Sequence, residues 1–300
     1  MLYRGEGARY LAKIAVDCES KGPARRVLAS GDGWSVSDVI CGAGPSDRPF
    51  EEQFSNVSIA IVLTGSFSYR STAGRELMTP GSLLLGNAGQ YFECGHEHAV
   101  GDRCVSFTFD QRYFEDLAAE AGVPSARTPF SRLRVPPVRQ LSSLVSRARA
   151  GLEEVGDSWC PVSMRWEEIG VALATQALTV ATSPTSERPS LPAAEARVTR
   201  IVRMIEKCPD ANHGLAVLAR QAKLSRYQFL RVFHQVTGVT PHQYVRRARL
   251  RLAATQLMVE PHRILDIALD SGFGDVSNFN HAFRAEFGVS PRFFRSGARR

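Results

Sequence analysis

The segment from Ser225 to Pro241 reads SRYQFLRVFHQVTGVTP, and the segment from Asp275 to Pro291 reads DVSNFNHAFRAEFGVSP. Fifty residues apart, the two share one plan: a capping residue, two phenylalanines four residues apart, and a Gly-Val-Thr/Ser-Pro ending. The oxygens of Ser225 and Asp275 can accept a free amide of the first helical turn. Gly238 and the matching glycine of the second copy can end each helix in the left-handed conformation. The repeat therefore predicts two helices built to the same pattern.

The apolar side chains of each copy fall on one helical face, at the spacing i, i+3, i+4, i+7 or close to it. These stripes are Phe229, Val232, Phe233 and Val236 in the first copy, and Phe279, Ala282, Phe283 and Phe287 in the second. A short apolar helix and a tight connection precede each copy. In the first they are Leu215 to Leu218 and Ala222-Lys223-Leu224, and in the second Ile264 to Ala268 and Gly272-Phe273-Gly274. Each copy is thus predicted to be a helix-turn-helix unit.

A single long helix is predicted between the copies, with Thr240 as its cap and Pro241 in its first turn. One side of this helix is marked by Val245, Ala248, Leu252 and Leu257, and the remainder is crowded with Arg246, Arg247, Arg249 and Arg251. Two units on a rigid connector predict a partner that has a repeat of its own. Double-helical DNA has one, because successive major grooves on one face lie about 34 Å apart.

Residues from about Ala194 to Arg295 resemble the DNA-binding domain of AraC/XylS-type bacterial transcription regulators. The second unit carries most of the resemblance, in Gly272-Phe273-Gly274-Asp275-Val276-Ser277-Asn278-Phe279, Phe283, Phe287, Gly288, Ser290, Pro291 and Arg295. The resemblance implies a regulator that binds double-stranded promoter DNA and contacts RNA polymerase, as an activator does. The sequence leaves open whether transcription rises or falls. An ordinary helical bundle would explain the stripes but not the duplicated caps and stops.

The family pattern also implies which side chains contact DNA. They are Arg226, Tyr227, Leu230, Arg231 and His234 in the first unit, and Val276, Ser277, Asn280, His281 and Arg284 in the second. The guanidinium of Arg231 can bond both acceptors of a guanine, and Asn280 can pair with adenine. The alternative for each is a solvated or phosphate-facing side chain. The residues of the second unit expected to face the groove, Val276, Ser277, Asn280 and His281, include no arginine or lysine, so the first unit should discriminate more strongly.

Length and charge favour two domains with different partners. The chain has 300 residues, more than a usual single domain, and residues 193–300 hold 18 Lys and Arg against 8 Asp and Glu. The first 192 residues hold the other 19 basic residues against 22 acidic ones. A basic excess confined to the repeat is expected of a surface that displaces counterions from phosphates. No long apolar run, signal peptide or disulfide-like cysteine rhythm occurs, which favours a cytoplasmic protein without membrane contact.

The first part reads as short strands with turns between them, typical of an antiparallel barrel or jelly roll. The predicted strands are Val27–Ser30, Trp34–Ile40, Val57–Leu63, Phe67–Ser71, Leu83–Leu85, Tyr91–His98 and Val105–Phe109. Leu63-Thr64-Gly65 and Pro80-Gly81-Ser82-Leu83 are similar to the cupin-like effector or oligomerisation domain of the same family. The predicted fold class is α+β in two domains, with trailing helices on the first and an all-α second.

Three helices are expected after the strands: Tyr113–Ala121, Val138–Val155 and Val162–Ala181. Their apolar stripes fit either packing within the domain or a homodimer interface, which the family often places here. We therefore divide the chain into an effector-sensing or dimerisation domain (1–182), a proline-rich linker (183–192) and a DNA-binding domain (193–300). The linker favours motion between the domains.

One cluster could bind a ligand: Cys94-Gly95-His96-Glu97-His98, followed by Cys104. In a strand, the side chains of Cys94, His96 and His98 share one face, and two imidazoles with thiolates suit zinc or another divalent metal. Four roles stay open: structural hydrogen bonding, metal or redox sensing, contact with a small-molecule effector, or a catalytic metal. Metal-binding cupins place their Pro-x-Gly motif after the histidine pair, whereas Pro80-Gly81 precedes it here.

No phosphate-binding glycine loop, nucleophile elbow or telling carboxylate pair occurs in the sequence, so a non-enzyme is expected. The rival reading is a cupin-type metalloenzyme or metal sensor fused to a DNA-binding tail. Metal analysis and a turnover screen would separate the two, because a regulator's domain binds its ligand without transforming it.

Overall fold

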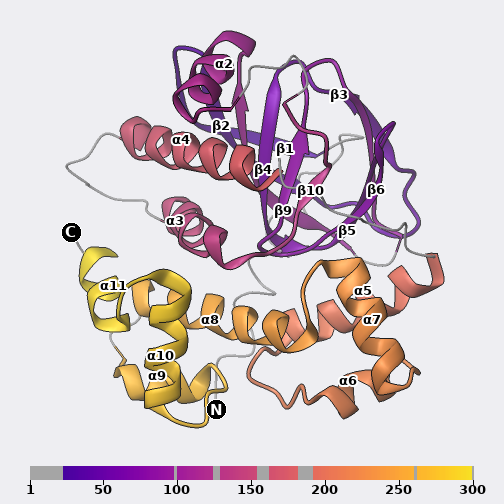
Figure 1. Cartoon of the computed structure of the whole chain (residues 1–300), viewed down its shortest axis with the longest axis vertical. Helices are drawn as coiled ribbons and strands as arrows, with labels where there is room; N and C mark the ends of the chain where they lie inside the picture. Colours follow the sequence, from indigo (N-terminus) through magenta and orange to yellow (C-terminus); the bar gives the residue numbers. More distant parts are fainter. Residues whose placement is uncertain are drawn as a thin grey trace.

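The computed structural model describes residues 23–97, 100–123, 129–153, 162–181, 192–259 and 262–298. A β-rich part with its own helices lies along an all-helical part, as Figure 1 shows. The predicted α+β fold class is therefore confirmed. The predicted linker lies outside the described residues, except that Pro192 begins helix α5 (Pro192–Lys207).

The strands form two antiparallel sheets. The six-stranded sheet has the order β1-β2-β9-β4-β7-β10, and the four-stranded sheet has the order β3-β8-β5-β6. The first consists of β1 (Ala24–Gly31), β2 (Trp34–Cys41), β9 (Asp102–Phe109), β4 (Val57–Gly65), β7 (Leu83–Gly86) and β10 (Arg134–Val135). The second consists of β3 (Phe50–Gln53), β8 (Tyr91–Gly95), β5 (Phe67–Ser71) and β6 (Gly74–Met78).

Strand β4, inside the six-stranded sheet, is buried on both faces from Val57 to Leu63, which explains why Ile59 to Leu63 read as a continuous apolar run. Ile59 and Ile61 point to a core shared with the helices, while Ala60 and Val62 point to the core between the two sheets. Side chains alternate along a strand, so a strand with two buried faces needs apolar residues at every position. The four-stranded sheet closes the second core with Phe67, Tyr69 and other side chains.

Three strands escaped the sequence analysis, and all three lie at sheet edges: β3, β6 and β10. An edge strand pairs on one side only, and these are two to five residues long, so little hydrophobic pattern marks them. The prediction that Tyr91–His98 is one strand is wrong for its end, because β8 stops at Gly95. His96 therefore lies beyond the strand, and His98 lies outside the described residues.

The helices of the first part cover the outer face of the six-stranded sheet. They are α2 (Gln111–Glu120), the short 3-10 helix η1 (Arg139–Leu141), α3 (Ser142–Glu153) and α4 (Val162–Ala181). The apolar stripe predicted for α4 is Ile169, Leu173, Ala177 and Val180; the first three are buried in the core of this domain, and Val180 is partly buried against it. Packing within the domain therefore accounts for the stripe that also suited a dimer interface.

The helical part has two cores, one at each end of α8 (Pro241–Val259). The first unit is α6 (Leu215–Gln221) and α7 (Arg226–Thr237), and the second is α9 (Ile264–Asp270) and α10 (Val276–Phe287), followed by α11 (Pro291–Ala298). Tyr244, Val245 and Ala248 of α8 enter the first core, while Leu250, Ala253 and Leu257 enter the second. The predicted single stripe on this helix is wrong for Leu252, which is half-buried, because the two bundles pack on different faces.

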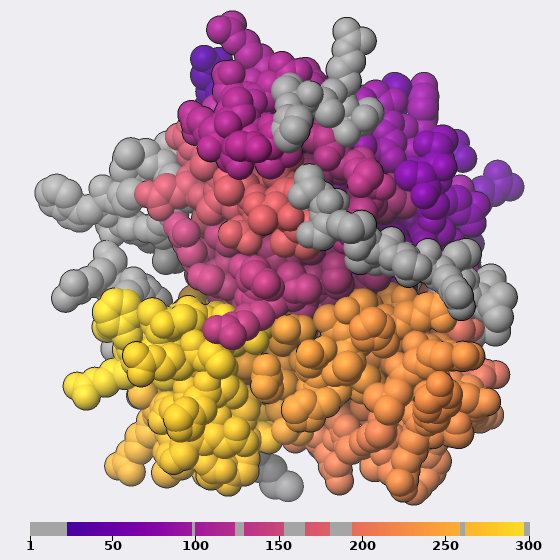
Figure 2. Space-filling model, in the orientation of Figure 1, coloured from indigo at the N-terminus to yellow at the C-terminus, as the bar shows by residue number. Residues whose placement is uncertain are grey.

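The two parts touch along an extended boundary, which Figure 2 shows as the β-rich part resting on the helices of residues 192–298. Leu77 of β6 belongs to the core of the first helix-turn-helix unit. Helix α3 contacts both α8 and α10. The β-rich part therefore contacts both helix-turn-helix units in this structure.

Candidate functional site

The first unit has the predicted caps at both ends of α7. Ser225 Oγ accepts the amide of Gln228 at 3.2 Å, and Gln228 Oε1 accepts the amide of Ser225 at 3.3 Å, which completes a capping box. At the other end, Gly238 adopts a left-handed φ of 76°. The tight connection before the helix places Lys223 at a φ of 54°. These local contacts fix where α7 starts and how it leaves α6.

The stripe of α7 is buried and the predicted DNA-contacting residues lie on its outer face. Phe229 and Phe233 are fully buried, with their ring centroids 5.4 Å apart. The side chains predicted to contact DNA are all exposed: Arg226, Tyr227, Leu230, Arg231 and His234. Tyr227 is 76% exposed, the largest exposed fraction among the large hydrophobic side chains of the described residues.

The second unit repeats this construction. Asp275 Oδ1 accepts the amide of Asn278 at 2.7 Å and caps α10, and Gly288 ends the helix at a φ of 78°. Gly272, in the turn before α10, has a φ of 85°, and an added Cβ would lie 2.8 Å from Cα of Asp210. Only glycine fits both the conformation and the space.

The outer face of α10 holds the second predicted set. Ser277, Asn280, His281 and Arg284 are exposed. Val276 is half-buried at the first turn. The structure therefore brings each predicted set together on one exposed helix face. The two sets lie at opposite ends of α8, which Figure 1 makes plain.

The arginines of α8 form internal contacts that the sequence did not reveal. Arg247 Nε lies 3.0 Å from Glu286 Oε1; the side chain of Glu286 is buried and that of Arg247 is 11% exposed. Arg251 pairs with Glu206 of α5. Burial is the largest single effect and lowers the pKa of Arg251, but Glu206, Tyr244 and Glu286 together outweigh it, so the pKa is raised. The basic excess of this part is therefore not all available to phosphates.

Arg249 also acts within the fold. Its guanidinium donates to the main-chain oxygens of Pro209 at 2.9 Å, Ala211 at 2.9 Å and Gly272 at 2.7 Å. It thereby joins the loop after α5 to the turn before α10. The sequence contained one sign of the ion pair between Arg247 and Glu286. Glu286 occupies the position of Val236 in the first copy, and Val236 is buried.

The cysteine and histidine cluster is only partly assembled as predicted. Cys94 and Cys104 are buried and line one cavity, but the ligand atoms that converge belong to Cys41, His96 and Asp102, all within 4.8 Å of one another. The sequence analysis missed Cys41 and Asp102. Little in the sequence could have revealed these two residues as ligands. They meet because Cys41, at the end of β2, pairs with Asp102, at the start of β9.

The cavity lies between the two sheets and has a volume of about 300 Å³. Phe50, Phe54, Phe67 and Phe92 supply much of its apolar lining, and Cys41, Cys94, Cys104 and Asp102 lie at its polar part. Burial raises the pKa of the Cys94 and Cys104 thiols well above the usual value, and the charge of Asp102 adds to the shift. Both thiols are therefore neutral at physiological pH.

None of the helices within the described ranges combines the length and apolar character needed to cross a lipid bilayer.

Comparison with known proteins places the helical part among transcription regulators. A family model described as a helix-turn-helix domain matches residues 218–297. The chain is 32% identical over 98 residues to the regulatory protein SoxS of Salmonella typhimurium, a match that covers 33% of this chain and 92% of SoxS. It is 34% identical over 103 residues to the transcriptional activator RhaS of Salmonella schwarzengrund, covering 34% of this chain.

The chain spans only 37% of the length of RhaS, since the similarity is confined to the helical part. Among solved structures, a transcriptional regulator with an AraC-type DNA-binding domain from Chromobacterium violaceum shares 26% identity at a TM-score of 0.34, over 36% of this chain and 96% of that one.

Proposed function

The chain belongs to the AraC family of DNA-binding transcription regulators, and from that membership we propose that α7 and α10 read two successive major grooves on one face of a promoter. One observation carries the proposal: two capped helices with exposed polar faces are held at opposite ends of the single helix α8. Successive grooves lie about 34 Å apart, so a rigid connector fixes both the spacing and the face that is read.

Base readout is assigned to the exposed faces of both helices. Arg231 donates to O6 and N7 of a guanine, and Asn280 pairs with an adenine. Tyr227 and Leu230 give the first unit apolar surface for thymine methyl groups. His234 and Arg284 lie near the C-terminal ends of their helices and are assigned to phosphates.

The test is a footprint on operators selected from random DNA by the full-length protein. Two protected segments about 10 base pairs apart on one face are expected. Because the connector is rigid, inserting either about 5 or about 10 base pairs between the segments should remove the second contact. A flexible tandem reader would tolerate the longer insertion, and protection of a single groove would contradict the proposal.

Control by the first domain is proposed from the contacts that it makes with both recognition helices. Arg134 of β10 bonds the last residue of α7, and Ser142 of α3 bonds Glu286 of α10. Both contacts lie at C-terminal ends, away from the predicted base-reading residues. Together they fix how the two units are oriented, so a signal that shifts the first domain would change their fit to DNA.

The signal proposed is a small molecule or metal ion bound in the cavity between the sheets, whose apolar lining and polar end fit a compact ligand. A homodimer and contact with RNA polymerase are proposed as further parts of the same regulator. Light scattering with and without operator DNA tests the first, and transcription with purified polymerase tests the second. The metalloenzyme alternative is not favoured, because the relatives described above are regulators.

A further inference from the structure

Four potential ligand groups of the β-rich part meet where three strands end or begin. Cys41 is the last residue of β2, Asp102 is the first of β9, and the two are direct partners across the strand pair. His96 directly follows β8. Cys104 lies two residues into β9, on the same side of the strand as Asp102. The sheet topology thus assembles side chains that are up to 63 positions apart, from Cys41 to Cys104.

The carboxylate of Asp102 lies at the centre of this group. Its Oδ1 is 2.6 Å from Nε2 of His96, and its Oδ2 accepts the thiol hydrogen bond of Cys104 at a distance of 3.4 Å from Sγ. Ligand atoms of Cys41, His96 and Asp102 all lie within 4.8 Å of one another. The side chains of His96 and Asp102 are only 1% and 7% exposed. Such a set is shielded from water and already close to the spacing of metal ligands.

We propose that Cys41, His96 and Asp102, with Cys104 as the fourth ligand, bind one divalent transition-metal ion of the zinc class. Two thiolates, one imidazole and one carboxylate form a ligand set that zinc accepts in tetrahedral geometry, at about 2.0–2.3 Å from each atom. The ion takes the place of the proton between His96 and Asp102. Cys94 and Cys104 both line the same cavity and both stand outside the group of three closest ligand atoms. Cys104 is proposed as the fourth ligand because its thiol bonds Asp102, and Cys94 serves as the matched control.

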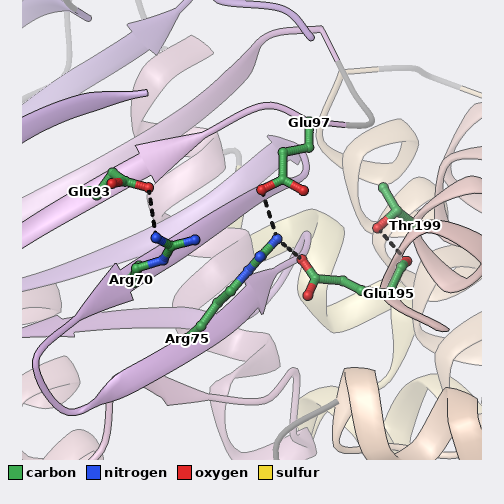
Figure 3. A network of polar contacts seen from close by, with 6 residues as sticks. All are labelled: Arg70, Arg75, Glu93, Glu97, Glu195 and Thr199. Atoms are coloured by element: carbon green, nitrogen blue, oxygen red, sulfur yellow. Dashed lines mark hydrogen bonds and ion pairs between the residues drawn. The ribbon is translucent and has the colours of Figure 1, made fainter. Parts of the chain in front are cut away.

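The residue after His96 is linked to the helical part, and Figure 3 shows Arg75 between Glu97 and Glu195. Glu97 Oε1 accepts a hydrogen bond from Arg75 Nη2 at 2.9 Å, and the same nitrogen donates to Glu195 Oε1 of α5 at 3.1 Å. Glu195 is buried, and its carbonyl accepts the hydroxyl of Thr199. Arg75 thus bridges a β-domain carboxylate and a carboxylate of the helical part.

An ion between His96 and Asp102 must widen the 2.6 Å separation of Nε2 and Oδ1, because each ligand atom lies about 2.0–2.2 Å from a tetrahedral zinc ion. The shift of His96 moves the neighbouring Glu97, and with it the contact that Arg75 shares with Glu195. We assign the proposed control of DNA binding to these contacts from Glu97 through Arg75 to Glu195. This assignment rests on the proposed function, whereas the metal site does not. Metal binding then changes the position of α5 relative to the β-rich part. The first helix-turn-helix unit moves with α5, because α7 packs on that helix.

The site is tested by titrating Co²⁺ into metal-stripped full-length protein. One equivalent of Co²⁺ should produce a thiolate-to-cobalt charge-transfer absorption band. Added zinc should displace the cobalt and remove the band. The band should persist in Cys94→Ser and Cys208→Ser. Cys41→Ser or Asp102→Asn should weaken binding about 10- to 100-fold. No band in the wild-type protein, or equal loss in the Cys94→Ser control, would overturn the site. Neither result depends on how the Asp102→Asn variant folds.

The route is tested on the same samples by DNA affinity with and without zinc. Zinc should change the DNA affinity of the wild-type protein about tenfold, and Arg75→Gln should reduce or abolish this effect of zinc. An affinity that ignores zinc in a protein that shows the cobalt band would overturn the route through Arg75. Absence of DNA binding in every sample would instead count against the proposed function, because the cobalt spectrum decides the site independently.

Discussion

Arg134 Nη1 donates a hydrogen bond to the main-chain oxygen of Thr237, the last residue of α7, at 3.1 Å. The same guanidinium pairs with Glu76 of β6 through Nε at 2.9 Å, and its side chain is only 2% exposed. The carbonyls at a helix C-terminus carry partial negative charge and lack partners within the helix, so a buried guanidinium is well placed there. The β-rich part thus supplies a C-terminal cap to the first recognition helix.

Arg134→Ala should therefore loosen the last turn of α7. A hydrogen bond from a charged donor contributes about 1.5–3 kcal/mol, so amide hydrogens near Thr237 should exchange faster by the corresponding factor. Hydrogen exchange by mass spectrometry on the full-length protein checks this. Arg139, which is exposed in η1, provides the control substitution Arg139→Ala. Unchanged exchange in α7 would mean that the contact does not hold this helix end.

The buried pair of Arg247 and Glu286 predicts a stability cycle. Arg247→Met alone should cost about 3–5 kcal/mol, because it leaves a buried carboxylate without its cation. The double variant Arg247→Met, Glu286→Val should recover most of this loss, because the first copy of the repeat has Val236 at the corresponding position. Urea denaturation of the three proteins measures the cycle. A double variant as unstable as the single one would show that Glu286 has another structural role.

Arg231 should read a guanine. Arg231→Ala is expected to cost about 1–3 kcal/mol of binding free energy on the preferred operator, and much less on an operator with that guanine replaced. Asn280→Ala should act in the same way on one adenine of the second groove. Fluorescence anisotropy on the wild-type and replaced operators separates these cases. Equal loss on every sequence would make Arg231 a phosphate contact.

The hydrogen bond by which Asp275 caps α10 should contribute measurably to the free energy of unfolding of the protein. Asp275→Ala should destabilise the protein by about 1 kcal/mol, because the amide of Asn278 loses its acceptor. Asp275→Asn keeps an acceptor and should cost much less. Thermal denaturation of both variants checks the difference. Equal effects would show that the negative charge of Asp275 matters more than the hydrogen bond.

A fragment of residues 191–300 should bind DNA by itself, and its affinity should fall steeply with salt. Each arginine that neutralises a phosphate releases condensed counterions, so the logarithm of the affinity should fall by about 0.9 per phosphate contact for each tenfold rise in salt. Because Arg247, Arg249 and Arg251 bond within the fold, we expect Arg247→Met to leave this slope unchanged. A reduced slope would place Arg247 on the DNA.

The sequence alone determined the features that depend on neighbours along the chain. Caps at Ser225 and Asp275, stops at Gly238 and Gly288, and the apolar stripes of α7 and α10 are local patterns, and all are found in the structure. A helix forms its hydrogen bonds within a few residues, so its ends and buried face are encoded where they occur. The exposure of the predicted DNA-contacting faces follows from the same periodicity.

Only the tertiary structure decided which charged groups meet. Arg247 and Glu286 are 39 positions apart, and Arg75 and Glu195 are 120 apart, so no local pattern joins them. Cys41, His96 and Asp102 converge because antiparallel pairing brings the end of β2 beside the start of β9, and packing of the second sheet against the first brings the end of β8 to the same place. Strand pairing partners and domain contacts arise from the packing of distant surfaces. The sequence showed only that the arginines of α8 lie around its apolar side; in the fold, Arg247, Arg249 and Arg251 bond to other parts of the helical domain.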